Sequence, residues 1–133
     1  MTAIVATVLV AEDHPVYRAR IAGLLEGWGL RTLVAADGRA ALRVIEGGDA
    51  VDLVVTDLEM PHYTGFEVIE GWLRRGGRPE AVIMVTGEAD ARDVRDRCAA
   101  GGIRLLHKTA IDTRFEEAVR DALRWLESER SRP

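Results

Sequence analysis

The fold is decided by one stretch of the chain, Val51-Asp52-Leu53-Val54-Val55-Thr56-Asp57-Leu58-Glu59-Met60-Pro61. It begins as a valine-rich apolar run, which is typical of a strand buried on both faces of a parallel sheet. The run ends at Asp57, and Pro61 cannot continue an inner strand. We therefore predict a carboxylate at the carboxyl end of a central strand, which is the edge where open parallel sheets bind ligands. The alternative is that Asp57 only caps the following turn.

Apolar runs and helical patterns alternate five times along the chain. The predicted strands cover residues 7–11, 30–35, 51–56, 81–86 and 103–108. Such alternation predicts an α/β fold, in which a parallel sheet carries helices on both faces, joined by right-handed crossovers. The first, third and fourth strands are the most apolar, so they should be central. The predicted strand order is therefore 2-1-3-4-5, a flavodoxin-like, doubly wound (βα)5 three-layer sandwich.

The chain length of 133 residues predicts a single domain, which we place at 1–133. Its core should run from about residue 7 to residue 126, and a polar tail should follow from Ser128. Two local predictions can be checked directly. Asp13 should cap the first helix, and Leu73 should face inward from the third.

Composition narrows the function classes. With 47% hydrophobic and 30% charged residues the chain is typical of a soluble globular protein, and the net charge of −4 favours neither nucleic acid nor a membrane as partner. A single cysteine excludes an intrachain disulfide and a cysteine-based metal site, and favours the reducing cytoplasm. No apolar run is long enough to span a bilayer. Residues 1–7 lack the basic region of a signal peptide.

Three carboxylates should meet at the carboxyl edge of the sheet. In the predicted order, Glu12 and Asp13 end the strand next to the one that ends in Asp57. Like charges at close range oppose each other's ionisation, so a cation would stabilise all three. Mg²⁺ (or Mn²⁺) is the simplest choice, because it accepts a few carboxylates and keeps several waters. Helix capping alone would account for one of these acids but not for three.

The basic residues are unusual, since only one of the 18 lysines and arginines is a lysine, Lys108. Lys108 ends the fifth predicted strand and Thr86 ends the fourth, so both should lie beside the acids. A hydroxyl, an ammonium and a metal ion could each take one oxygen of a phosphoryl group in transfer. Asp57 would be the nucleophile and would form an acyl phosphate.

In this order Glu12-Asp13, Asp57-Leu58-Glu59-Met60-Pro61 with Gly65, Thr86-Gly87 and Lys108 resemble the receiver domain of two-component response regulators, including single-domain regulators of the chemotaxis type. The resemblance covers about residues 7–126. It implies phosphorylation of Asp57 by a phosphohistidine of a partner histidine kinase or histidine phosphotransfer protein. It also implies that Glu12, Asp13, Asp57 and the main-chain carbonyl of Glu59 bind the metal, and that Thr86 and Lys108 contact the phosphoryl group. Such a domain catalyses its own phosphorylation and dephosphorylation without being a conventional turnover enzyme.

The chain departs from the family pattern at three positions. Thr64 stands where Asp is frequent, Leu105 replaces a frequent aromatic residue, and Thr109 replaces the usual proline after the lysine. A cis bond costs about 3–4 kcal/mol before a residue other than proline. We therefore predict a trans Lys108–Thr109 bond, with the Thr109-Ala110-Ile111 loop displaced and Lys108 still directed at Asp57.

Several interpretations are compatible with these motifs. The chain could be a stand-alone receiver or a receiver from a hybrid histidine kinase, and it could be a receiver that binds partners without phosphorylation. Output should pass to a downstream protein through the fourth helix, fifth strand and fifth helix, where a dimer could also form.

We expect no DNA-binding module after Pro133. A metal-dependent phosphohydrolase would need further catalytic segments. A flavin or nucleotide module is disfavoured, because Glu12 and Asp13 would repel a phosphate.

Overall fold

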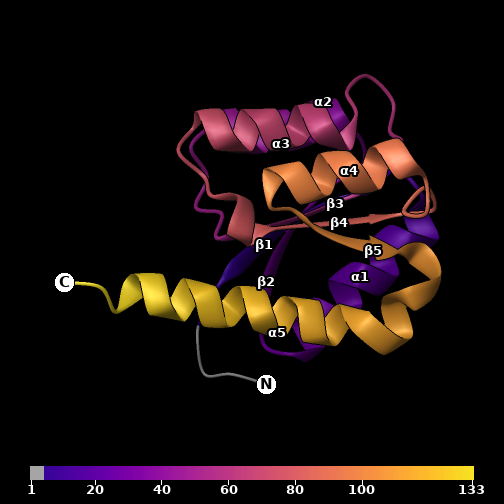
Figure 1. Cartoon of the computed structure of the whole chain (residues 1–133). Helices are drawn as coiled ribbons and strands as arrows, with labels where there is room; N and C mark the ends of the chain where they lie inside the picture. Colours follow the sequence, from indigo (N-terminus) through magenta and orange to yellow (C-terminus); the bar gives the residue numbers. More distant parts are fainter. Residues whose placement is uncertain (1–4) are drawn as a thin grey trace.

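The structure, a computed structural model, describes residues 5–133. Residues 1–4, which open the segment predicted not to be a signal peptide, lie outside the described residues. A five-stranded parallel sheet has the order β2-β1-β3-β4-β5, as predicted (Figure 1). The strands are β1 (Thr7–Ala11), β2 (Arg31–Ala35), β3 (Leu53–Thr56), β4 (Val82–Thr86) and β5 (Arg104–His107).

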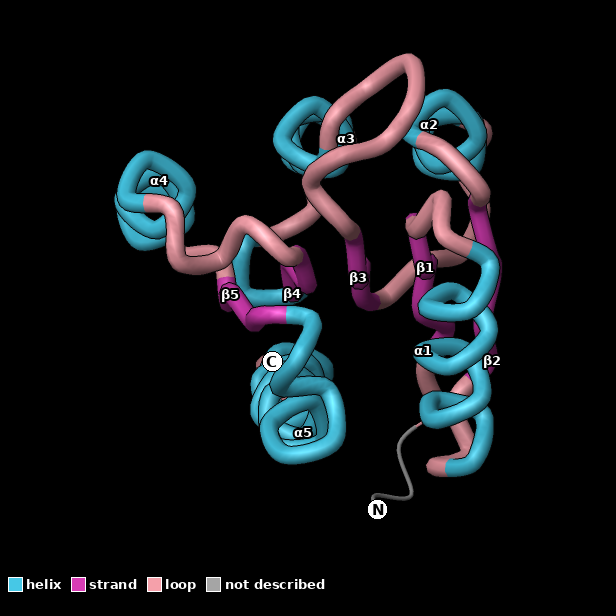
Figure 2. The backbone as a smooth tube through the Cα atoms, turned by 90° about the vertical axis from the view of Figure 1, so that its right-hand side faces the viewer, coloured by secondary structure: helices cyan, strands magenta, loops and turns pink. Residues whose placement is uncertain are grey.

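Helices cover both faces of this sheet. They are α1 (Pro15–Gly27), α2 (Gly38–Glu46), α3 (Gly65–Arg74), α4 (Arg92–Gly101) and α5 (Ile111–Arg130), with short 3₁₀ helices η1 (Pro79–Ala81) and η2 (Lys108–Ala110). Figure 2 shows α2, α3 and α4 on one side of the strands, and α1 and α5 on the other. This is the three-layer arrangement that the alternation predicts. In residues 5–133 no helix is long and apolar enough to cross a membrane.

The core lies between these layers, on both faces of the central strands. Every residue of β3 and β4 is buried, whereas β2 and β5 are only partly buried, as edge strands should be. α4 is the most weakly anchored helix, because Val94 and Cys98 are its only buried residues. By contrast, α2 buries Ala41, Leu42 and Ile45, and α5 buries Phe115, Val119, Ala122 and Leu126.

Two local predictions are wrong, and one helix boundary differs from the expected one. The residue that caps α1 is His14 rather than Asp13, because the His14 Nδ1 atom accepts a hydrogen bond from the Val16 amide. Leu73 is 42% exposed, because the buried face of α3 is built instead around residues such as Val68. The polar residues from Ser128 onward are partly helical, since α5 continues to Arg130.

Candidate functional site

Sheet register brings the predicted acids together. Ala11 pairs with Thr56 across β1 and β3, and the Asp57 amide donates to the Ala11 carbonyl over 2.9 Å. The residues that follow these two strands, Glu12 and Asp57, are therefore neighbours at the carboxyl edge. Carboxylate oxygens of Glu12, Asp13 and Asp57 all lie within 4.8 Å of one another.

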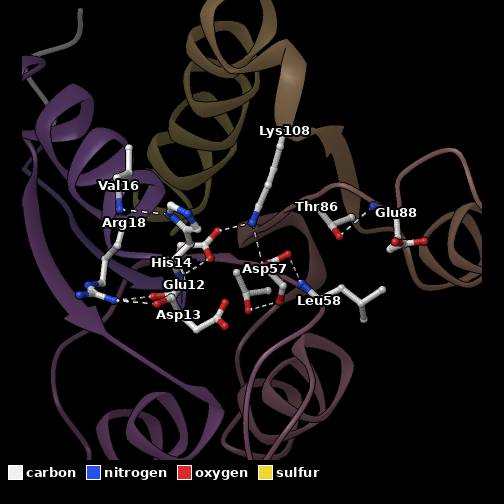
Figure 3. A network of polar contacts seen from close by, with 11 residues as sticks. Glu12, Asp13, His14, Val16, Arg18, Asp57, Leu58, Thr86, Glu88 and Lys108 are labelled. Atoms are coloured by element: carbon white, nitrogen blue, oxygen red, sulfur yellow. Dashed lines mark hydrogen bonds and ion pairs between the residues drawn. The ribbon is translucent and has the colours of Figure 1, made fainter.

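Lys108 reaches this cluster from the end of β5. Its Nζ atom lies 3.0 Å from Asp57 Oδ2 in a hydrogen bond and 3.0 Å from Glu12 Oε1 in an ion pair. Figure 3 shows the side chain directed between the two carboxylates. The site is largely removed from water, because Glu12 is 1% and Asp57 5% exposed. The Lys108 ammonium is therefore the counter-charge of two buried carboxylates.

The pKa values of Glu12 and Lys108 are both shifted by burial and by their contacts. Desolvation raises the pKa of Glu12 above its usual value, and the nearby Asp57 carboxylate raises it further, against the hydrogen bond from the His14 amide and the charge of Lys108. Burial alone would lower the pKa of Lys108, but contacts with Glu12 and Asp57 outweigh this effect and raise it. The Lys108 ammonium thus stays charged at neutral pH.

Main-chain donors orient the acids. The Leu58 amide donates to Asp57 Oδ1 over 2.7 Å, and the His14 amide donates to Glu12 Oε2 over 3.0 Å. Gly65 lets α3 start close to the site, because a Cβ atom there would clash with the Asp57 carbonyl oxygen. Sequence reasoning missed both amide donors, since main-chain groups carry no residue-specific signal.

Thr86 lies at the end of β4, paired with His107 of β5, and is buried. Its Oγ1 atom accepts a hydrogen bond from the Glu88 amide over 3.1 Å (Figure 3). Because the oxygen is the acceptor here, the hydroxyl proton can be donated to another group. This hydrogen bond joins the hydroxyl directly to the loop that leads into α4.

The donor set fits a hard divalent cation. Glu12 Oε1 is buried and has no hydrogen-bond partner within residues 5–133, so its ion pair with Lys108 is its only polar contact there. Asp13 is exposed at the rim and its carboxylate faces the same space. Oxygen ligands without histidine or cysteine suit Mg²⁺ better than Zn²⁺. Glu59 lies two residues after Asp57, and its carbonyl stays a predicted ligand.

The Lys108–Thr109 bond is trans, as predicted, since residues 5–133 contain no cis peptide. The chain turns directly into η2, where His107 Nδ1 accepts a hydrogen bond from the Thr109 amide over 3.1 Å. The side chain of Lys108 still reaches Asp57. Proline after the lysine is therefore not needed to direct the ammonium to the acids.

The sequence did not predict that Tyr17 would lie beside the site. Tyr17 lies in the first turn of α1, and its ring centroid is 4.5 Å from Lys108 Nζ. The helical spacing of Tyr17 predicts only an inward-facing residue. The contact with a lysine 91 positions away arises because the Lys108 side chain reaches across the carboxyl edge of the sheet to Glu12, close to the start of α1.

Comparison with known proteins gives a consistent result. Residues 8–120 match the family described as the response regulator receiver domain. The chain is 33% identical over 96 residues to the sensor histidine kinase RcsC of Salmonella typhimurium, a match that covers 72% of this chain and 10% of that kinase. It therefore spans about a tenth of that relative's length.

Solved structures agree on the fold. The receiver domain of the Francisella response regulator 1452 has a TM-score of 0.75 and 25% identity, over 90% of this chain and 98% of that one. The response regulator TrrA of Thermotoga maritima, solved in complex with Mg²⁺-BeF, has a TM-score of 0.74 and 24% identity, over 88% and 98% of the two chains. With the family match over most of its length, the chain belongs to the response regulator receiver domain family.

Proposed function

We propose that this chain accepts a phosphoryl group on Asp57 and thereby switches a protein-interaction surface. The observation that carries the proposal is the single lysine, whose Nζ atom lies 3.0 Å from Asp57 Oδ2 inside a cluster of three carboxylates. An Asp57 oxygen would attack the phosphorus atom, and the bond from phosphorus to the donor's leaving group would break. The product is an acyl phosphate.

Each neighbouring side chain has a part in this transfer. The Lys108 ammonium would neutralise charge on one phosphoryl oxygen, and the Thr86 hydroxyl would donate to another. Glu12, Asp13, Asp57 and the Glu59 carbonyl would hold Mg²⁺ (or Mn²⁺). That ion would supply charge neutralisation for the oxygens of the transferring group.

The phosphoryl donor would be a phosphohistidine of a histidine kinase or of a histidine phosphotransfer protein. The chain's match to one part of a sensor histidine kinase supports such a partner. Both a stand-alone receiver and a receiver within a hybrid kinase agree with this match. We propose that the whole of residues 1–133 acts as one receiver unit, in the reducing cytoplasm that the single cysteine favours.

Output would pass through the face formed by α4, β5 and α5, which could also form a dimer. When Thr86 turns toward the phosphoryl group, its hydrogen bond with the Glu88 amide would be disturbed, and the weakly anchored α4 would respond. Leu105 lacks an aromatic ring, so the change should be concentrated in residues 86–100. Amide exchange with and without a phosphoryl mimic tests this, and equal exchange in residues 86–100 would contradict it.

Phosphorylation itself is tested with Mg²⁺ and a small acyl-phosphate donor, read by intact mass. Wild type should gain one phosphoryl group, and Asp57→Asn should gain none. Asp49→Asn is a matched control, because Asp49 is exposed in the loop before β3. Labelling of Asp57→Asn, or labelling that survives chelation of divalent cations, would refute the assignment. Complete absence of labelling in wild type would favour a receiver that only binds partners.

A further inference from the structure

We propose that Tyr17 is a positioning residue for Lys108. The face of the Tyr17 ring holds the Lys108 ammonium beside Asp57 when a divalent cation binds the carboxylates. The proposal rests on the proposed function only for the role of Lys108 in phosphoryl transfer. The contact itself is independent of that role, and it can be measured on the unphosphorylated protein.

The geometry is that of a cation over an aromatic face. Lys108 Nζ lies 4.5 Å from the Tyr17 ring centroid, within the range of about 6 Å for such contacts. The Lys108 side chain is only 16% exposed, so little water competes with the ring. The ring of His14 packs edge-on against Tyr17, with centroids 5.3 Å apart and planes at 70°. This packing helps to fix the direction of the Tyr17 ring.

The three partners of the ammonium differ in what else they can bind. Asp57 and Glu12 are the oxygen donors that a divalent cation would also use. A bound cation would repel the ammonium and draw the Glu12 carboxylate away from it. The face of Tyr17 has no role in binding the metal, so it would keep its contact. Tyr17 is therefore the one partner that holds Lys108 both with and without the cation.

Positioning matters because of the chemistry of lysine. Its ammonium is a strongly hydrated point charge on a flexible four-carbon stem. Fixing that stem in advance lowers the entropy cost of placing the charge on a phosphoryl oxygen. The rival explanation is that Tyr17 only fills space between α1 and the site. A substitution that keeps apolar bulk but removes the π-face separates the two explanations.

The first experiment uses the fact that Lys108 is the only lysine. In protein labelled with ¹³C and ¹⁵N at lysine, Lys108 gives the only lysine side-chain resonances, and the ring should shift its terminal methylene protons upfield. We expect this shift in wild type and in Tyr17→Phe, with and without saturating Mg²⁺, and its loss in Tyr17→Leu. Loss of the shift when Mg²⁺ binds wild type, or its survival in Tyr17→Leu, would overturn the proposal.

The second experiment measures transfer to Asp57 from a small acyl-phosphate donor at saturating Mg²⁺. Tyr17→Leu should be slowed roughly three- to tenfold, from the usual strength of such contacts, with the Mg²⁺ dissociation constant unchanged. Tyr17→Phe should recover the wild-type rate, because it restores the ring. Tyr63→Leu, which removes the only other tyrosine, should keep the wild-type rate. A wild-type rate for Tyr17→Leu would refute the positioning role. Failure of the proposed function would instead abolish labelling in every variant, including wild type.

Discussion

Replacing Lys108 with methionine should destabilise the protein, and Mg²⁺ should repair much of the loss. The substitution keeps an unbranched side chain of similar length but removes the ammonium that lies 3.0 Å from both Asp57 Oδ2 and Glu12 Oε1. Two buried carboxylates then face each other and Asp13 without a counter-charge. A divalent cation can take the place of the lost charge, and it no longer has to approach an ammonium.

The magnitude follows from the burial of the site. Removing one partner of a buried ion pair costs about 3–5 kcal/mol, and because Lys108 retains 16% exposure we take the lower end. A chain of 133 residues has an unfolding entropy of roughly 0.28 kcal/mol/K, so a loss of about 3 kcal/mol lowers Tm by about 11 °C. At tenfold excess over its dissociation constant, Mg²⁺ adds roughly 1.4 kcal/mol to wild type.

The variant should gain more from the same Mg²⁺ concentration. If removal of the ammonium tightens Mg²⁺ binding about tenfold, the gain rises to about 2.7 kcal/mol. The deficit would then shrink from about 3 to about 1.7 kcal/mol, or from about 11 °C to about 6 °C in Tm.

Calorimetry measures the Tm of wild type and of Lys108→Met, each with chelator and with Mg²⁺. Arg20→Met is a suitable control, because it removes a cation from the exposed ion pair with Asp112 and should not change the response to Mg²⁺. An equal Mg²⁺ gain in wild type and Lys108→Met would refute the reasoning. So would an unchanged Tm of the variant in chelator.

Three further predictions concern the acidic cluster and the anchoring of α4. Asp13→Ala should abolish the stabilisation by Mg²⁺ in a melting assay, and an unchanged response would place the ion elsewhere. The raised pKa of Glu12 means that the folded state holds this proton more tightly than the unfolded state, so this contribution to stability is full below the ordinary value of 4.5 and is lost as pH rises through the raised pKa. Glu12→Gln should therefore gain stability relative to wild type in chelator as pH rises above 4.5, and a difference that is constant with pH would argue against it. The Arg97 guanidinium lies 4.0 Å from the Phe66 ring centroid and joins α4 to α3, so Arg97→Ala should speed amide exchange in α4 by roughly two- to fivefold, whereas Arg92→Ala should not.

Most of the fold could be predicted from the sequence, because buried parallel strands are apolar along their whole length. The runs that become β1, β3 and β4 are continuous and valine-rich, and each ends at a polar residue that marks the carboxyl edge. Strand order then places Glu12 beside Asp57 without any knowledge of side-chain contacts. This is why the geometry of the acids could be anticipated.

Local contacts decide what the sequence could not predict. Asp13 and His14 can both cap a helix, and only the fold determines which side chain turns back toward the Val16 amide. The end of α5 could not be predicted from the sequence either, since residues after Leu126 have no apolar periodicity. Arg130 nevertheless extends the helix, because its guanidinium lies 3.0 Å from Asp52 Oδ1 and donates to the Val5 carbonyl over 2.7 Å.

The carboxylates at the two ends of β3 differ in how their charge is balanced. Asp52, before the strand, accepts from the Thr7 amide over 2.8 Å and pairs with the permanently charged Arg130. That pair is neutral and calls for no further ion. The cluster around Asp57, after the strand, sets three carboxylates against the one ammonium of Lys108. When ionised it carries two unbalanced negative charges, which is the charge that one divalent cation neutralises. We propose that this balance of charge favours Mg²⁺ binding at this end of the strand, and that it favours Asp57 over Asp52 as the phosphoacceptor.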